Sequence, residues 1–247
     1  MGNKLALLIS VITLGSCSYI LDIKRSGEIK KTETPWNGAS SIEVWTPCKL
    51  VLVNSENPFM EVEGMDFIVD GYDLIQSDDK LVIEHKNTNW LQEEKIANIT
   101  LGASDFKRVT FNSPGKITTR DTLSITQLQI VVNGKGIYTT SHLILKGDNF
   151  SLSVYGGVNK SSHHLSGELR NAQYNMEGGT DIDALELKTK KVSVILKSYG
   201  NIFLNATEKL TGKIYSTGNI YYSGDPNVEV EIVKNSVMQA SGKTIRY

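Results

Sequence analysis

Apolar and polar residues alternate along most of this chain, and in its second half the alternation repeats at a fixed distance. Successive apolar pairs stand 22 residues apart: Ile130/Val132, Leu152/Val154 and Tyr174/Met176. Alternation with a period of two predicts β-strands that bury one face. A fixed longer period predicts structural repeats that stack on one another. Shorter copies of the same pattern are expected further on, at Val194/Leu196 and Ile214/Ser216.

Two further columns follow the 22-residue lag. The first is formed by glycines at the ends of the strand patterns: Gly134, Gly156, Gly178 and Gly200. The second is apolar: Phe106, Leu128, Phe150 and Ala172. One coil of this length cannot bury its own apolar face, so the core must form between coils stacked about 4.8 Å apart. We therefore predict an all-β solenoid with coils of about 20–22 residues; a β-sandwich is the alternative, because it also has alternating strands separated by turns.

The N-terminus has the features of an export signal. Lys4 precedes a short apolar run over residues 5–14, and Gly15 and Ser16 precede Cys17. The run is too short to span a membrane, which takes about 20 residues. This order resembles a bacterial lipobox, which implies cleavage after Ser16 and a lipid thioether on Cys17 that anchors the protein. An ordinary secretory signal with a chance cysteine is the alternative.

These features divide the chain into three parts. Residues 1–16 are predicted to be the lipoprotein signal peptide, and the charged segment 17–34 the lipidated N-terminus and a flexible tether. Residues 35–247 are predicted to form the solenoid domain. If Cys17 carries lipid, Cys48 has no partner for a disulfide within the chain, and it is interpreted as a small buried residue.

Composition narrows the range of partners. The chain has 26 Lys and Arg residues against 27 Asp and Glu residues, which gives a formal net charge of −1, and no basic block stands out. This balance argues against nucleic acid and against a polybasic membrane patch as partners. Contact with the membrane is therefore expected through the N-terminal lipid alone.

Four segments in a fixed order resemble a known family. They are Trp36-Asn37-Gly38-Ala39-Ser40-Ser41-Ile42-Glu43-Val44, Cys48-Lys49-Leu50-Val51-Leu52, Met60-Glu61-Val62-Glu63-Gly64 and Lys80-Leu81-Val82-Ile83. Their order is similar to the opening of GIN domains, described as "putative auto-transporter adhesin, head GIN domain" proteins and common in Bacteroides and relatives. The resemblance covers residues 36–247. It implies a right-handed parallel β-helix on an exported, often lipidated protein, and it supplies no catalytic residues.

Several polar columns could carry chemistry if the coils stay in register. One follows the 22-residue lag on an outer face: His142, His164, Glu186 and Glu208. Such a ladder could bind a transition metal, but solvated polar residues beside a core strand are the preferred interpretation, and neither metal nor cofactor is predicted. A second column, Lys146, Glu168 and Lys190, is interpreted as cross-strand charge pairing.

A carboxylate pair suggests the competing functional class. Asp181 and Asp183 could serve a polysaccharide lyase or hydrolase built on a parallel β-helix, but no second acid joins them at the lag, so a Gly-Asp turn is preferred. Tyr155 and Tyr199 precede their glycines and should point outward, where aromatic rings can stack on sugars. The Asp121-Thr122-Leu123 segment matches an O-glycosylation pattern described for Bacteroides-type bacteria, which would place a glycan on Thr122.

The sequence therefore predicts a non-catalytic exported lipoprotein. It would act as an adhesin or cell-envelope binding module that presents a rigid solenoid surface to a glycan or a protein. A carbohydrate-active enzyme is the alternative, and a module that stacks with copies of itself as a homo-oligomer is a third interpretation. The expected location is the cell envelope, lipid-anchored at the outer membrane on its periplasmic or surface side.

Overall fold

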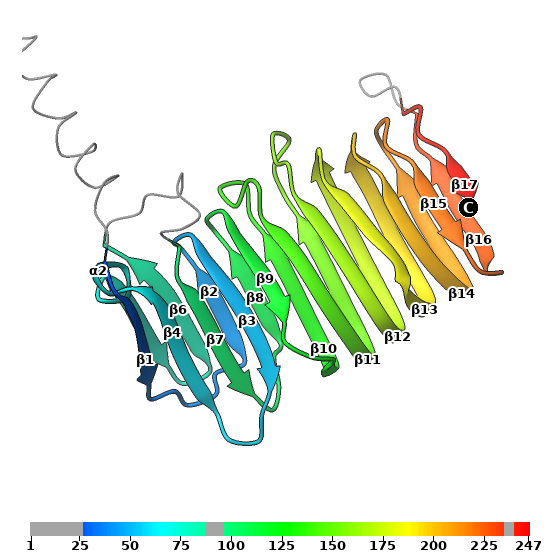
Figure 1. The fold of residues 1–247 in the computed structure, drawn as a ribbon. Helices are drawn as coiled ribbons and strands as arrows, with labels where there is room; N and C mark the ends of the chain where they lie inside the picture. Colours follow the sequence, from blue (N-terminus) through cyan, green and yellow to red (C-terminus); the bar gives the residue numbers. More distant parts are fainter. Residues whose placement is uncertain (1–26, 87–95, 235–239) are drawn as a thin grey trace, which may run out of the picture.

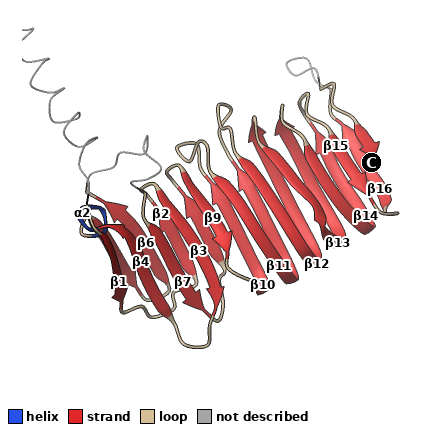
Figure 2. Ribbon diagram, in the orientation of Figure 1, coloured by secondary structure: helices blue, strands red, loops and turns tan. Residues whose placement is uncertain are grey.

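The computed structural model describes residues 27–86, 96–234 and 240–247, so the signal peptide and Cys17 lie outside the described residues. The chain forms a β-solenoid of about six turns with 66% of its residues in strands (Figures 1 and 2). This architecture confirms the predicted solenoid over the β-sandwich. Within the described part of the chain, no helix is both long and apolar enough to cross a membrane.

Two long sheet faces run the length of the solenoid. The first face contains, in spatial order, β6 (Lys80–His85), β2 (Ser41–Val44), β8 (Arg108–Phe111), the later parts of β10 (Leu123–Val132), β11 (Thr140–Val154), β12 (Ser162–Gly178), β13 (Asp181–Ser198) and β14 (Ile202–Ile214), and β16 (Asn227–Ile232). The second contains β7 (Asn98–Ala103), β3 (Cys48–Asn54), β9 (Gly115–Thr119), the first parts of β11 to β14, β15 (Ile220–Ser223) and β17 (Thr244–Arg246). A shorter third face joins them through the start of β10 and the middle of β11, β12 and β13.

The core forms between coils, as the period predicts. Leu152 pairs in parallel register with Ile130 on one side and with Tyr174 on the other, and all three side chains are buried. Leu128, Phe150 and Ala172 form the second predicted column in the same way. Residues 22 apart are therefore neighbours through this part of the chain.

The shortened copy predicted at Val194/Leu196 is confirmed, because these residues pair with Tyr174 and Met176, but the other register predictions after Met176 are wrong. Gly178 pairs with Ser198, not with Gly200, and Leu196 pairs with Ile214, a separation of 18 residues. The coil shortens twice. Two residues (179–180) separate β12 from β13, where seven (155–161) separate β11 from β12, and the register between β13 and β14 then shifts between Ala184 and Lys188 on the third face. The expected match of Val194 with Ile214 fails for this reason, and Gly212 faces Val194 instead.

The N-terminal end departs from a simple winding. The coil made by β2 and β3 lies between the β6–β7 and β8–β9 coils, because each of its strands is hydrogen-bonded on both sides. Strand β1 (Ile29–Thr34) pairs antiparallel with β4 (Phe59–Met65), which in turn pairs antiparallel with β7. The tether predicted up to Thr34 is therefore too long, because residues 29–34 belong to the folded domain.

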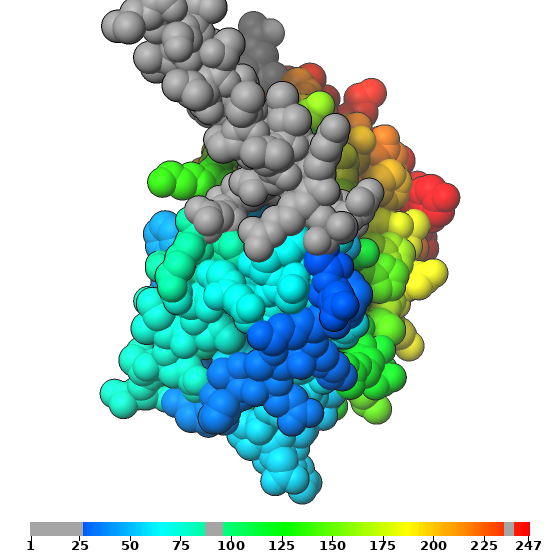
Figure 3. Space-filling view, turned by 60° about the vertical axis from the view of Figure 1, so that its left-hand side comes forward, coloured from blue at the N-terminus to red at the C-terminus, as the bar shows by residue number. Residues whose placement is uncertain are grey.

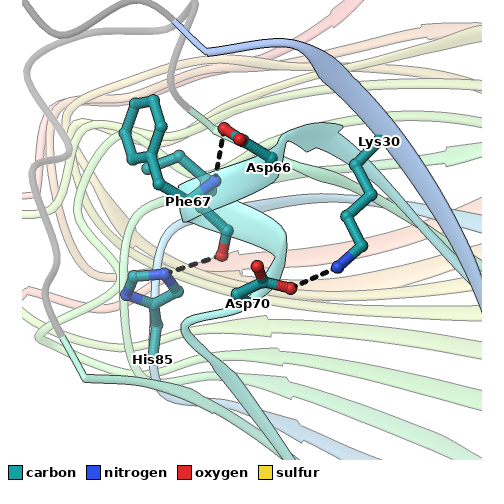
Figure 4. Close-up of polar contacts among 6 residues, drawn as sticks. Lys30, Asp66, Phe67, Asp70 and His85 are labelled. Carbon is teal, nitrogen blue, oxygen red and sulfur yellow. Dashed lines mark hydrogen bonds and ion pairs between the residues drawn. The ribbon is translucent and has the colours of Figure 1, made fainter.

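Antiparallel strands and a short helix close this end of the solenoid. Strand β5 (Tyr72–Ser77) pairs antiparallel with β6, and α2 (Asp66–Val69) lies between β4 and β5. Figure 3 shows the blue and cyan segments covering this end. Polar contacts hold α2 in place: Lys30 pairs with Asp70, the Phe67 amide donates to Asp66, and His85 Nε2 donates to the Ile68 carbonyl over 3.0 Å (Figure 4).

Candidate ligand-binding ridge

Turns between the first and second faces lie one above another along a single edge. The Asn112 amide donates to the Val44 carbonyl, the Asn133 amide to Phe111, and the Tyr155 amide to Val132. These bonds place each turn directly beside the turn of the neighbouring coil. We name this edge the corner ridge and define it by residues 45–47, 112–114, 133–139, 155–161, 179–180 and 199–201. It runs along the upper edge of the solenoid in Figure 1, where the loops after β10 and β11 project.

Exposed aromatic rings gather on the corner ridge. The exposed fractions are 47% for Trp45, 55% for Tyr138, 40% for Tyr155 and 53% for Tyr199. Val158, on the same edge, is also exposed. Tyr155 and Tyr199 therefore face outward as expected from the alternation, while their contact with sugars remains a prediction.

Trp45 and Tyr138 were not among the candidates from the sequence. Trp45 continues the strand pattern of residues 42–44 and stands two residues before Pro47, so nothing local separates it from a strand residue. Tyr138 lies in a seven-residue turn, and only the register of the finished solenoid brings that turn beside the turn that begins with Tyr155. The local pattern gives the direction of a side chain, but it does not show which turns share an edge.

The four ridge aromatics keep their ring faces available. Among the described residues, none of them stacks on another aromatic ring. Gly179 makes room for Tyr199, because a Cβ atom at that glycine would lie 2.5 Å from the tyrosine ring. The ring can therefore lie against the preceding coil and present its other side outward.

Polar groups lie between the rings. Asn133 Nδ2 donates to Asn112 Oδ1 over 2.6 Å, so an amide pair separates the levels of Trp45 and Tyr138. The Glu177 carboxylate accepts from the Gly156 amide over 2.9 Å and pairs with Lys197 Nζ at 3.6 Å. Hydrogen-bonding groups are thus interspersed among the apolar rings of the ridge.

Buried hydroxyl groups hold the turns from beneath. Thr139 Oγ1 donates to the Gly136 carbonyl, and Thr180 Oγ1 donates to the Glu177 carbonyl. Ser198 Oγ donates to the carbonyls of Gly178 and Thr180 and accepts from the Gly200 amide. Because these bonds satisfy the buried backbone of the turns, the rings above them sit on a fixed base.

Tyr138 has an unusual backbone. Its φ is 63°, and among the described residues it is the only residue other than glycine with a positive φ. The left-handed region costs an ordinary residue about 1–2 kcal/mol. A strained residue that also exposes a large ring is a candidate for function, because strain of this kind clusters at binding sites.

The predicted histidine–glutamate ladder starts on the outer side of the second face, away from the corner ridge. His142 and His164 are register partners whose rings stack with centroids 4.7 Å apart. His164 Nδ1 lies 3.5 Å from Asp183 Oδ2, and Nε2 lies 3.9 Å from Glu186 Oε2. The predicted histidine–glutamate ladder fails beyond this point, because Glu186 is in register with Ser166.

Other predicted columns also change at the shortened coils. Glu208 pairs with Lys190 at 3.5 Å and is not part of a histidine ladder. Glu168 is in register with Lys146 as expected, but its next neighbour is Lys188, not Lys190. Within the described ranges, no group of three or more His, Cys, Asp or Glu residues is arranged to hold a metal ion.

The predicted carboxylate pair is open to solvent. Asp181 Oδ1 accepts from the Asn201 amide over 2.8 Å, and Asp183 faces His164 on one side and Phe203 on the other. Both aspartates are exposed on a strand surface. A flat, solvated position of this kind favours a binding module over an enzyme with acids in a cleft.

Aromatic rings on the second face use their faces on one another. Phe203 and Tyr221 stack with centroids 4.7 Å apart and planes 10° apart, and Tyr247 meets Phe203 edge-on. Their stacking follows the coil spacing and stabilises the C-terminal coils. This cluster is therefore less suited to stacking on a ligand than the corner ridge.

His163 points into the core, a position that the sequence did not flag. It is 1% exposed, and its Nδ1 lies 2.9 Å from Ser141 Oγ while its Nε2 has no hydrogen-bond partner. Burial lowers the pKa of His163 from its ordinary 6.5 to about 3. This histidine is therefore neutral at ordinary pH and has no access to a ligand.

Two single-residue predictions have clear positions. Cys48 is a free, fully buried thiol, and burial raises its pKa from 9.0 to about 12, which agrees with its interpretation as an inert core residue. Thr122 is exposed in the short turn before β10, and its carbonyl accepts from Asn54 Nδ2. Glycosylation of Thr122 stays a prediction.

Comparisons with known proteins agree on the family and the fold. Residues 39–226 match the family model described as "putative auto-transporter adhesin, head GIN domain". Similar solved structures include a "putative adhesin" from Bacteroides fragilis, with 19% identity, a TM-score of 0.74, and coverage of 90% of this chain and 98% of that one. A "putative lipid binding protein" from Parabacteroides distasonis has 17% identity, a TM-score of 0.65, and coverage of 89% and 98%. No curated protein matches the chain.

Proposed function

The chain belongs to the "putative auto-transporter adhesin, head GIN domain" family, and on that premise we propose that it is a lipid-anchored, adhesin-like protein whose corner ridge binds glycan. An adhesin-like role in the cell envelope follows from the family and from the adhesins among its structural neighbours. The lipid anchor and the glycan ligand are the parts that we add.

A single observation supports the ligand: the exposed aromatics Trp45, Tyr138, Tyr155 and Tyr199 share one edge, and none of them stacks on another described aromatic ring. Aromatic faces contact the C–H faces of sugar rings, and nearby amide, carboxylate and ammonium groups can bond to sugar hydroxyls. The Asn112–Asn133 and Glu177–Lys197 pairs provide such groups between the rings. A protein partner would more typically require a continuous apolar centre with a polar rim.

The anchor follows from the N-terminal sequence. Gly15, Ser16 and Cys17 directly follow the apolar run, in the order that lipoprotein processing requires. Intact mass of the mature protein should show loss of residues 1–16 and a diacylglyceryl group with an added acyl chain on Cys17. A Cys17→Ser variant should lose the lipid mass and leave the membrane fraction, and an unlipidated wild-type protein would refute the anchor.

Glycan binding is tested with the mature protein on an array of bacterial and host polysaccharides. The wild type should bind at least one glycan, and replacing all four ridge aromatics by alanine should abolish that binding. Tyr247→Ala is the matched control, because Tyr247 is an exposed ring at the C-terminus, away from the ridge. A blank array would contradict the proposal, and so would binding that survives loss of all four rings.

A further inference from the structure

We infer that the corner ridge binds a linear polysaccharide whose chain lies parallel to the solenoid axis and contacts successive aromatic rings. This inference rests on the proposed glycan ligand and adds its form and orientation. The inferred site is extended and crosses several coils, whereas a site for a short sugar would use a single ring.

Register fixes the order of the rings along the axis. The turn of residues 112–114 lies between Trp45 and the turn that carries Tyr138, because Asn112 bonds to Val44 and Asn133 bonds to Phe111. Trp45 and the turn of residues 133–139 are therefore two coils apart, or about 9.6 Å at the ordinary strand spacing.

The same spacing recurs further along the ridge. Val154 is in register with Met176, and Met176 with Leu196, so Tyr155 and Tyr199 also lie two coils apart, again about 9.6 Å along the axis. Counting from Trp45 to Tyr199 crosses five coil steps, or about 24 Å. Rings spread over this length exceed any monosaccharide and suit an extended chain that meets rings on four of the six coil levels.

The chemistry between the rings also fits such a chain. Aromatic rings interspersed with amide and charged groups match a polymer that presents both apolar sugar faces and hydroxyl groups. The turns are held by the buried hydroxyls of Thr139, Thr180 and Ser198, so the site needs little ordering when a long ligand binds. The positive φ of Tyr138 keeps one ring in a fixed, strained position within this line.

The inference is tested by ligand length. Mature protein is titrated with gluco-, xylo- and manno-oligosaccharides, each from disaccharide to octasaccharide, in isothermal calorimetry. For the series that binds, affinity should rise by at least about tenfold from disaccharide to octasaccharide, because each added ring contact is worth on the order of tenfold. Trp45→Ala and Tyr199→Ala, at opposite ends, should each weaken octasaccharide binding by about tenfold and leave disaccharide binding within about twofold.

Two outcomes separate this inference from the proposed function. If disaccharide and octasaccharide bind equally and only one ring matters, the ridge contains a single-sugar site; the axial chain is then refuted and glycan binding stands. If no saccharide of any length binds, both ideas fail together. Thermal unfolding of each variant checks folding, and tryptophan fluorescence gives a second readout: it should shift with octasaccharide in the wild type, and this shift should be lost in Trp45→Ala.

Discussion

Acid should weaken this fold through one buried histidine. His163 lies on the inner side of the second face, in register with Ser141 on one coil and Ile182 on the next. It is 1% exposed, and Ser141 Oγ is its single polar neighbour at 2.9 Å. Burial disfavours the charged imidazolium, so the pKa of His163 falls from 6.5 to about 3. Lowering the pH is therefore the perturbation, because the buried imidazole of His163 resists protonation in the folded state.

The direction of the effect follows from the two pKa values. Above pH 6.5 the histidine is neutral in both states and contributes no pH dependence. Below pH 6.5 the unfolded chain binds a proton that the folded chain rejects until about pH 3, so stability falls across that window. At pH 5 the loss is about 2 kcal/mol, and near pH 3 it approaches an upper value of about 5 kcal/mol.

A His163→Gln variant removes this titration. The free energy of unfolding is measured by urea denaturation at pH 8 and pH 5, and the drop between the two should be about 2 kcal/mol smaller in the variant than in the wild type. Leu165→Met is the matched control, because it changes a buried side chain of the same strand without removing a titratable group, and its drop should equal that of the wild type. If His163→Gln loses as much stability as the wild type between the two pH values, the reasoning is wrong.

Three further changes test the backbone and the core. Tyr138→Gly should keep the stability of the fold or raise it by up to about 1 kcal/mol, because glycine adopts the positive φ without strain. The same variant should weaken octasaccharide binding, because it removes a ring. A clear drop in the thermal unfolding temperature would contradict the strain at Tyr138. Gly167→Ala should cost more than about 2 kcal/mol, because its Cβ would lie 2.0 Å from the Leu145 carbonyl oxygen at a φ of 113°. Gly157→Ala is its control, since nothing lies within 4 Å of a Cβ there, and equal urea midpoints for the two would refute the packing argument. Leu152→Ala should cost about 2–5 kcal/mol in the same assay, because the side chain is buried between two coils, and a loss below about 1 kcal/mol would show that the coils do not share one core.

Periodicity predicted the middle of the solenoid well. Ile130, Leu152 and Tyr174 are true register partners because the three coils that hold them have equal length. The reasoning held for the shortened copy at Val194/Leu196 and failed beyond it, where the third face loses residues between Ala184 and Lys188. A bulge of this kind changes the register without disturbing the alternation of apolar residues, so the local pattern gave no sign of it.

Two of the four aromatic residues of the corner ridge could be predicted from the sequence. Alternation placed Tyr155 and Tyr199 on the outside, and their exposure agrees. Trp45 joins them only because its coil stacks directly against the 108–119 coil, through register partners that are 67 positions apart. His163 shows that the alternation reaches further than the candidates drawn from it: an inward Leu165 sends His164 outward and His163 inward, and the burial of His163 agrees.

The enclosed position of the β2–β3 coil has a consequence for how this chain is completed. Its neighbours on both sides, β6–β7 and β8–β9, are made after it, so one side of the first coil stays unpaired until the chain has emerged to residue 119. Assembly cannot simply follow the order of synthesis, and the windings of residues 123–214 are the natural starting point, because their register partners are only 17–22 residues apart. Truncation from the C-terminus would remove whole coils from one end of the solenoid, whereas deletion of residues 41–54 would remove a coil that has neighbours on both sides.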